Sequence, residues 1–256
     1  MLFKDSVFIG IDPPSGETAL TYAALDRELN LVAISRGDLS AVSAFAAGQK
    51  NTFVGVNAPR RVNAGLMKKG SVRDGLSPRP NPGRWTAFRV AEYGLFQKNI
   101  RIPKTPEKES ECPGWMRNGF SLYKRLESLG FQDYPAGDRV QQVLEVYPHA
   151  SYTVLLKRIP FLKKTLEGRL QRQLLLHSLS VAVPDPMRLF EEITRYKIMR
   201  GQLPLDGLYS VEELEALMAA YTAWKAAMEP DEITLVGDPR EGEITLPSRD
   251  LRTKYY

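Results

Sequence analysis

The sequence predicts an α/β fold in which helices flank a mixed five-stranded sheet that is followed by a C-terminal β-hairpin. Three short β-compatible runs separated by turns lie within the first 35 residues, which is typical of an antiparallel meander. Two later apolar runs, 52–57 and 140–147, are reached through helical segments, as parallel strands require. Hairpin-linked strands followed by crossover-linked strands indicate a mixed sheet.

The N-terminal elements follow from turn residues and caps. We expect a strand at 7–12, because Pro13 and Pro14 force a turn after it. Further strands are expected at 18–25 and 29–35, and Asp38 or Ser40 can cap a helix that runs to Ala47.

We expect one domain over residues 1–256, with a large insertion at 60–137 between the fourth and fifth core strands. The stretch 60–84 is rich in Gly, Pro, Arg and Lys and predicts a long loop. Helical spacing follows over 84–99, and Asn118 is expected to cap a helix that Gly130 closes.

The C-terminal part is mostly helical. Pro148 suits the first turn of a helix, because its missing N–H costs nothing there. Ser210 and Glu213 form a capping box for a helix to about Met228. We also expect helices over 166–174 and 185–201, a hairpin at 232–236 and 243–246, and a mobile tail.

Composition narrows the function classes. Cys112 is the only cysteine among 256 residues, which excludes an internal disulfide and a cysteine-based zinc site. No apolar run approaches the roughly 20 residues of a membrane helix, and the start lacks a signal-peptide pattern, so we expect a cytoplasmic protein. The net charge of +5 is compatible with a polyanionic partner.

A set of oxygen-bearing side chains is the main candidate site. Asp12 and Asn57 end two predicted strands, where ligands collect in open α/β sheets. We predict catalytic roles for Asp12, Asn57, Glu145 and Glu215, and Mg²⁺ or Mn²⁺ ligands in Asp12, Glu145, Glu212 and Glu215. Two such ions about 4 Å apart can activate water against a phosphodiester. Each residue also has a purely structural explanation, as a turn, cap or ion-pair partner.

The stretches FIGIDP, FVGVNAP, VLEVYPHA and EELEALMAAYTAW resemble the predicted-nuclease family catalogued as domain of unknown function 429, in order over nearly the whole chain. The resemblance implies an RNase H-like fold and a nuclease site at Asp12, Asn57, Glu145, Glu212 and Glu215. The chain departs from the family pattern, since Asn57 and both helix glutamates replace aspartates.

Basic residues of the insertion are the candidate nucleic-acid contacts, because cations interleaved with aromatic rings suit a strand-binding groove. They are Arg60, Arg61, Lys68, Lys69, Arg84 and Arg89.

The leading hypothesis is a metal-dependent nuclease acting on DNA or RNA. A non-catalytic nucleic-acid-binding protein with a degenerate site is the second, favoured by Asn57 and the helix glutamates. An ATP-dependent phosphotransferase of the actin and sugar-kinase type is the third, because IGIDPPSGETAL is similar to a phosphate-binding hairpin. No second phosphate loop follows Asn57.

Overall fold

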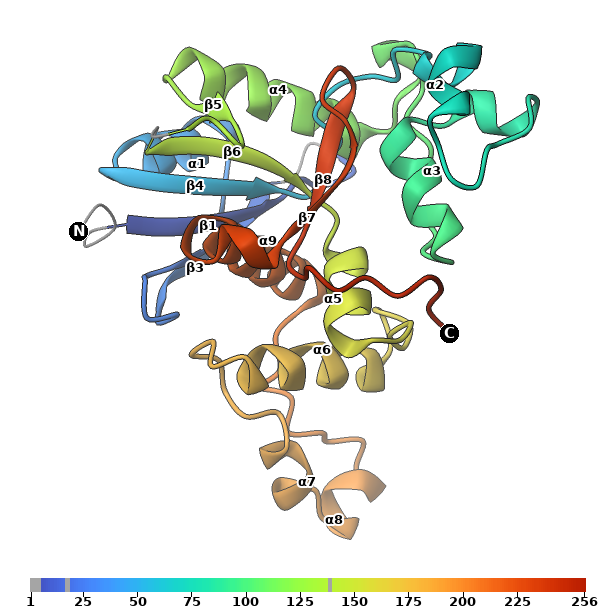
Figure 1. Ribbon diagram of the computed structural model, residues 1–256. Helices are drawn as coiled ribbons and strands as arrows, with labels where there is room; N and C mark the ends of the chain where they lie inside the picture. The colour runs from blue at the N-terminus through green and yellow to red at the C-terminus, as the bar shows by residue number, and fades with distance from the viewer. Residues whose placement is uncertain (1–5, 17–18, 138–139) are drawn as a thin grey trace.

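The computed structural model describes residues 6–16, 19–137 and 140–256. Within them one eight-stranded sheet runs in the order β3-β2-β1-β4-β6-β8-β7, with β5 paired to β6 (Figure 1). The strands are β1 Ser6–Asp12, β2 Leu20–Leu25, β3 Leu31–Gly37, β4 Asn51–Val56, β5 Gln132–Asp133, β6 Gln141–Val146, β7 Thr234–Asp238 and β8 Gly242–Leu246. The predicted position 18 at the start of the second strand lies outside the described residues.

The sheet is mixed, as expected, but larger than the five strands predicted. β1, β2 and β3 form an antiparallel meander, and β4 and β6 add in parallel to β1. The predicted C-terminal hairpin is present, and it extends the main sheet because β8 pairs in parallel with β6. The alternation of apolar and polar residues within a hairpin does not reveal which strand of the sheet the hairpin will pair with.

Helices cover both faces of this sheet (Figure 1). The helices α1 Leu39–Ala47 and α4 Gly114–Ser128 pack with β1, β4 and β6 residues in one core. The helix α9 Val211–Met228, with α5 Pro148–Leu156 and α6 Leu166–Ser178, covers the other face.

Gly10 allows α9 to lie directly on the backbone of β1. A Cβ atom at Gly10 would stand 1.9 Å from the carbonyl oxygen of Ala216. The small residues of α9 therefore set how closely this helix and its acidic first turns approach the carboxyl end of β1.

The segment 60–137 lies between β4 and β6 and contains several short helices before α4. They are η1 Leu66–Lys68, α2 Gly70–Asp74, η2 Arg84–Ala87, α3 Val90–Gln97 and η3 Glu109–Glu111. The cap predicted at Asn118 is wrong, because Pro113 precedes the first residue of α4. The Asn118 amide instead donates to the carbonyl oxygens of Pro14 and Gly16, at 2.9 and 3.0 Å, and ties α4 to the turn after β1.

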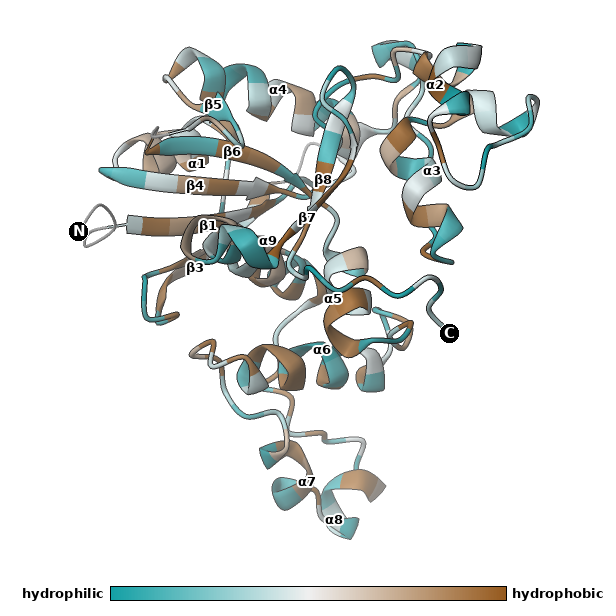
Figure 2. Cartoon of the chain, in the orientation of Figure 1, coloured by the Kyte–Doolittle hydropathy of each residue, from teal (hydrophilic) through white to brown (hydrophobic). Residues whose placement is uncertain are grey.

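Residues 185–201 do not form the single helix predicted. They form α7 Arg188–Glu192 and α8 Arg195–Met199, separated at extended Ile193 and Thr194. The two helices project from the body as an arm (Figure 1), and Figure 2 shows hydrophobic segments along it.

The expectation of a mobile C-terminal tail is corrected by its packing. After η4 Pro230–Glu232 and the hairpin, the chain returns to α3, where the Tyr255 N–H donates to the Lys98 carbonyl at 3.0 Å. The Tyr255 side chain is buried. Among the described helices, none combines the length and apolar character needed to cross a bilayer.

Candidate functional site

Asp12 and Asn57 meet at the carboxyl ends of two neighbouring parallel strands. Asp12 is the last residue of β1, and Asn57 directly follows β4. The Asn57 side-chain amide donates to Oδ1 of Asp12 at 2.7 Å. Asn57 therefore orients the Asp12 carboxylate.

Glu215 brings a second carboxylate to Asp12 from α9. Ser210 caps this helix in the predicted capping box with Glu213, so its first turn is firmly defined. The Glu215 side chain is buried, and Lys163 Nζ lies 3.2 Å from its Oε2. Its other oxygen, Oε1, is buried without a hydrogen-bond partner among the described residues. A buried carboxylate oxygen without a donor is costly and points to a missing ligand.

Asp12 lies within the electrostatic range of Glu215. Burial, followed by the negative charge of Glu215, raises the pKa of Asp12 from 3.8 to about 7. The Asn57 hydrogen bond and the positive charge of Lys163 act in the opposite direction, and Glu212 adds a smaller raising effect. At neutral pH the Asp12 carboxyl group is therefore only partly ionised.

Glu212 lies at the rim of the site. Its side chain is 53% exposed, and one of its oxygens is 3.9 Å from a guanidinium nitrogen of Arg36 on β3. The negative charge of Glu212 raises the pKa of Asp12 slightly. Glu212 lies one helical turn before Glu215, but its side chain is open to solvent.

Glu145 lies apart from this pair, contrary to our expectation. It pairs in register with Val56, which in turn pairs with Ile11, so it shares the face that packs against α4. Asp12 follows Ile11 and points to the opposite face, because side chains alternate along a strand.

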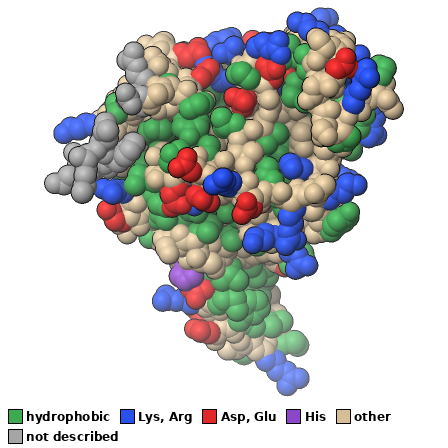
Figure 3. All heavy atoms as spheres, viewed as in Figure 1, with side chains coloured by type: hydrophobic (Ala, Val, Ile, Leu, Met, Phe, Trp, Pro, Cys, Tyr) green, Lys and Arg blue, Asp and Glu red, His purple; other side chains and the backbone are tan. Residues whose placement is uncertain are grey.

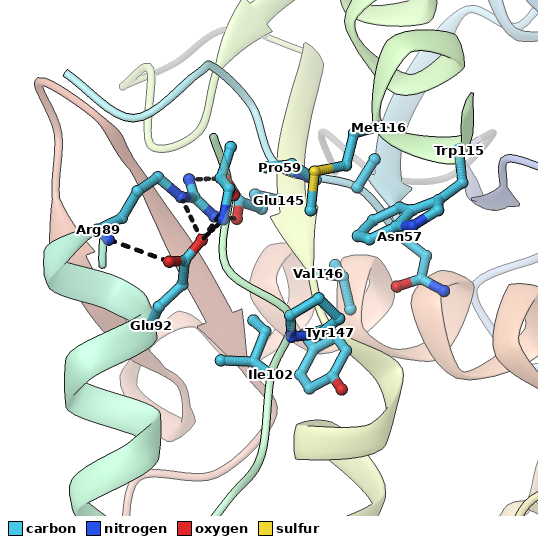
Figure 4. Close-up of a pocket in the computed structure, with 13 residues that line it drawn as sticks. Asn57, Pro59, Arg89, Glu92, Ile102, Trp115, Met116, Glu145, Val146 and Tyr147 are labelled. Atoms are coloured by element: carbon cyan, nitrogen blue, oxygen red, sulfur yellow. Dashed lines mark hydrogen bonds and ion pairs between the residues drawn. The ribbon is translucent and has the colours of Figure 1, made fainter. Parts of the chain in front are cut away.

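The buried guanidinium group of Arg89 forms an ion pair with Glu145. Arg89 Nη2 lies 2.5 Å from its Oε1, and the backbone N–H of Arg60 donates to its Oε2 at 2.7 Å. Arg89 also pairs with Glu92 at 3.1 Å. Figure 4 shows the Arg89 guanidinium directed at both carboxylates, with Asn57 on the far side of the pocket.

Most of the basic residues proposed as nucleic-acid contacts have partners within the protein. Arg60 pairs with Glu127 and Asp133, Arg61 with Asp133, and Lys68 with Glu107. Arg89 is buried and presents no surface to a strand, whereas Arg84 lies over the Trp85 ring at 4.1 Å and Lys69 is exposed. Figure 3 shows acidic and basic side chains interspersed over this view of the surface.

Arg172 lies within the electrostatic range of Glu215, and His149 lies within that of Arg172 and Lys163. Burial, with the positive charges of Arg172 and Lys163, lowers the pKa of His149 to about 4, so its imidazole is neutral at pH 7. Arg172 is buried, and its Nε has no hydrogen-bond partner among the described residues.

Sequence reasoning missed Lys163. It lies in the loop between α5 and α6, and only its membership of a two-lysine run marks it in the sequence.

The donor set fits one divalent cation better than two. The described residues contain no group of three or more His, Cys, Asp and Glu side chains arranged around a common metal position. Asp12 and the unpartnered oxygen of Glu215 nevertheless suit Mg²⁺ or Mn²⁺, since Mg²⁺ is often held by one or two carboxylates plus water. A second ion would need Glu145, which Arg89 occupies.

Comparison with known proteins gives one family. The model of the family described as "Protein of unknown function (DUF429)" matches residues 2–241. No curated protein and no solved structure matches the chain. The resemblance noted in the sequence motifs is confirmed.

Proposed function

We propose, from the premise that this chain belongs to the DUF429 family, that it is a metal-dependent nuclease with a single-ion carboxylate site. One observation carries the proposal. Glu215 Oε1 is buried without a partner, in the electrostatic range of an Asp12 whose pKa is raised to about 7. A divalent cation between these groups would give Glu215 Oε1 a partner and would stabilise the ionised form of Asp12.

The strand arrangement supports an RNase H-like fold as part of the proposal. The antiparallel β3-β2-β1 meander followed by parallel β4 and β6 is the arrangement implied by the sequence resemblance. The hairpin β7–β8 and the segment 60–137 are then additions to that core.

Each residue of the site has a distinct task in phosphodiester hydrolysis. When bound, the cation would lower the pKa of a water and neutralise charge on the phosphate. Asp12 and Glu215 would hold it, and Asn57 would keep the Asp12 carboxylate oriented. Glu212 at the rim would interact with the solvated side of the site, because its side chain is half exposed.

A cluster of cations supports a polyanionic substrate. Lys157, Arg158, Arg252 and Lys254 line one hollow with Tyr256. This hollow is at the C-terminal end of α5, which begins directly after Tyr147, a residue within the electrostatic range of Glu215. Nine residues of helix span about 13 Å, so a strand of nucleic acid could contact both regions.

A non-catalytic nucleic-acid-binding protein is the second candidate. The observation in its favour is that Glu145 is neutralised by Arg89, which leaves two buried carboxylates for the ion. Such a protein would bind nucleic acid equally well with and without Mn²⁺ and would not cleave it.

The deciding experiment compares wild type with Asp12→Asn and Glu215→Gln on single- and double-stranded DNA and RNA, with Mg²⁺, Mn²⁺ or EDTA. Each variant should lose about 100-fold or more of the cleavage rate, since losing even an outer-shell partner costs about 10- to 100-fold. Asp250→Asn is a matched control at an exposed position. Metal-independent binding without cleavage by wild type would favour the second candidate, and cleavage retained by Asp12→Asn would overturn the proposed site.

A further inference from the structure

Lys163 pairs with one oxygen of Glu215, next to the oxygen that a metal ion would use. Its Nζ is 3.2 Å from Glu215 Oε2, and its positive charge also lowers the pKa of Asp12. The lysine side chain is 45% exposed, whereas that of Glu215 is 2% exposed. The ammonium group therefore reaches inward from solvent, and it can return there without crossing the core.

The loop that carries Lys163 is fixed by its neighbours on α6. The Phe161 N–H donates to Gln171 Oε1 at 2.8 Å, and Arg172 Nη1 donates to the Phe161 carbonyl at 2.9 Å. A Cβ atom at Gly168 would be 1.9 Å from the Leu162 carbonyl oxygen, so the loop rests directly on the helix. These contacts hold the backbone around Lys163, whose side chain extends to Glu215 and remains partly exposed.

The charges of the site favour exchange over permanent pairing. Asp12 and Glu215 carry two negative charges when ionised; Lys163 supplies the positive charge in ion-pair contact with Glu215, and buried Arg172 acts on Glu215 without such a contact. A divalent cation would complete the neutralisation, and the lysine would then be a surplus like charge beside it. A permanent ion pair would also leave Glu215 Oε1 buried without a donor.

We propose that Lys163 is a built-in counter-ion that competes with the divalent cation for Glu215 and thereby sets the metal affinity of the site. Metal binding displaces the ammonium group into solvent, and loss of the metal lets it return. The inference rests on the proposed metal site, and it assigns to Lys163 a role that the carboxylates alone do not have.

The test measures Mn²⁺ binding by the full chain, from the spectroscopic signal of free Mn²⁺, so that the readout is independent of catalysis. Lys163→Met should bind Mn²⁺ about tenfold more tightly than wild type, because it removes a like charge within about 4–6 Å of the ion. Lys163→Arg keeps the charge and should bind as weakly as wild type. Lys164→Met removes the same charge from the next, exposed position, and it should change the affinity less than about twofold because exposed charges are screened.

The outcomes separate the two proposals. Equal Mn²⁺ affinity in wild type and Lys163→Met, or weaker binding by the variant, overturns the role of Lys163 and leaves the metal site standing. Tight binding by Lys163→Arg also overturns it, because charge would then not be the cause. Absence of Mn²⁺ binding in every variant overturns the metal site and this inference with it.

Discussion

Asp12, the last residue of β1, and Glu145, the next-to-last residue of β6, lie on opposite faces of the same sheet. Glu145 is level with Val56 and Ile11, and Asp12 is one residue beyond Ile11. Asp12 consequently lies on the face covered by α9, the helix that carries Glu215. Glu145 lies with Arg89 on the face covered by α4. The shift of one residue divides the predicted carboxylates into a candidate site and a structural ion pair.

Glu145 should matter for stability and leave metal binding unaffected. Replacing Glu145 with Gln leaves the buried Arg89 charge poorly compensated, which should lower the free energy of unfolding by about 3 kcal/mol. Urea denaturation followed by tryptophan fluorescence measures this loss, with exposed Glu191→Gln as the control. If Glu145→Gln folds with normal stability and loses Mn²⁺ binding, Glu145 is a ligand after all.

Asp12 should destabilise the metal-free protein as pH rises. Its pKa is about 7 when folded and near 3.8 when unfolded, so the unfolded chain releases the proton more easily. The loss of folding stability caused by ionisation of Asp12 is absent below about pH 4. It grows between about pH 4 and 7 and is complete above that range.

Asp12→Asn should therefore be more stable than wild type at pH 8 in EDTA, and the difference should shrink as pH falls toward 4. Denaturation at a series of pH values tests this, with Asp250→Asn as the control. A stability difference that does not change with pH would contradict the raised pKa, and added Mn²⁺ should reduce the advantage of the variant at pH 8.

Gly10 should control the distance between α9 and β1. Gly10→Ala places a methyl group against the Ala216 carbonyl, and no rotamer change can relieve a contact between Cβ and backbone. We expect a loss of about 2 kcal/mol or more in the free energy of unfolding, as for other overpacked cores. Mn²⁺ affinity should fall as well, because Glu215 moves with α9.

Gly16→Ala is the matched control for this substitution, since nothing lies within 4 Å of a Cβ atom there. Thermal unfolding and Mn²⁺ titration of both variants give the comparison. Normal stability of Gly10→Ala would mean that the helix can shift without cost and that the close approach does not hold the site together.

Local patterns predicted the parts of the fold that depend on local physics. The capping box at Ser210 and Glu213 and the β7–β8 hairpin are present, because caps and turns act between residues close in sequence. The cap expected at Asn118 is wrong, since its amide serves the distant turn at Pro14 and Gly16. The helix expected at 185–201 is divided, although no proline or glycine marks the break at Ile193 and Thr194.

The sequence by itself determined that Asp12 and Asn57 would meet, because both end parallel strands and parallel strands finish at one edge of a sheet. Only the tertiary structure decided which acid joins them. The packing of α9 on Gly10 brings in Glu215, the strand register turns Glu145 to the other face, and the loop before α6 adds Lys163. Each of these depends on contacts between residues far apart in the chain, for which the local pattern carries no signal.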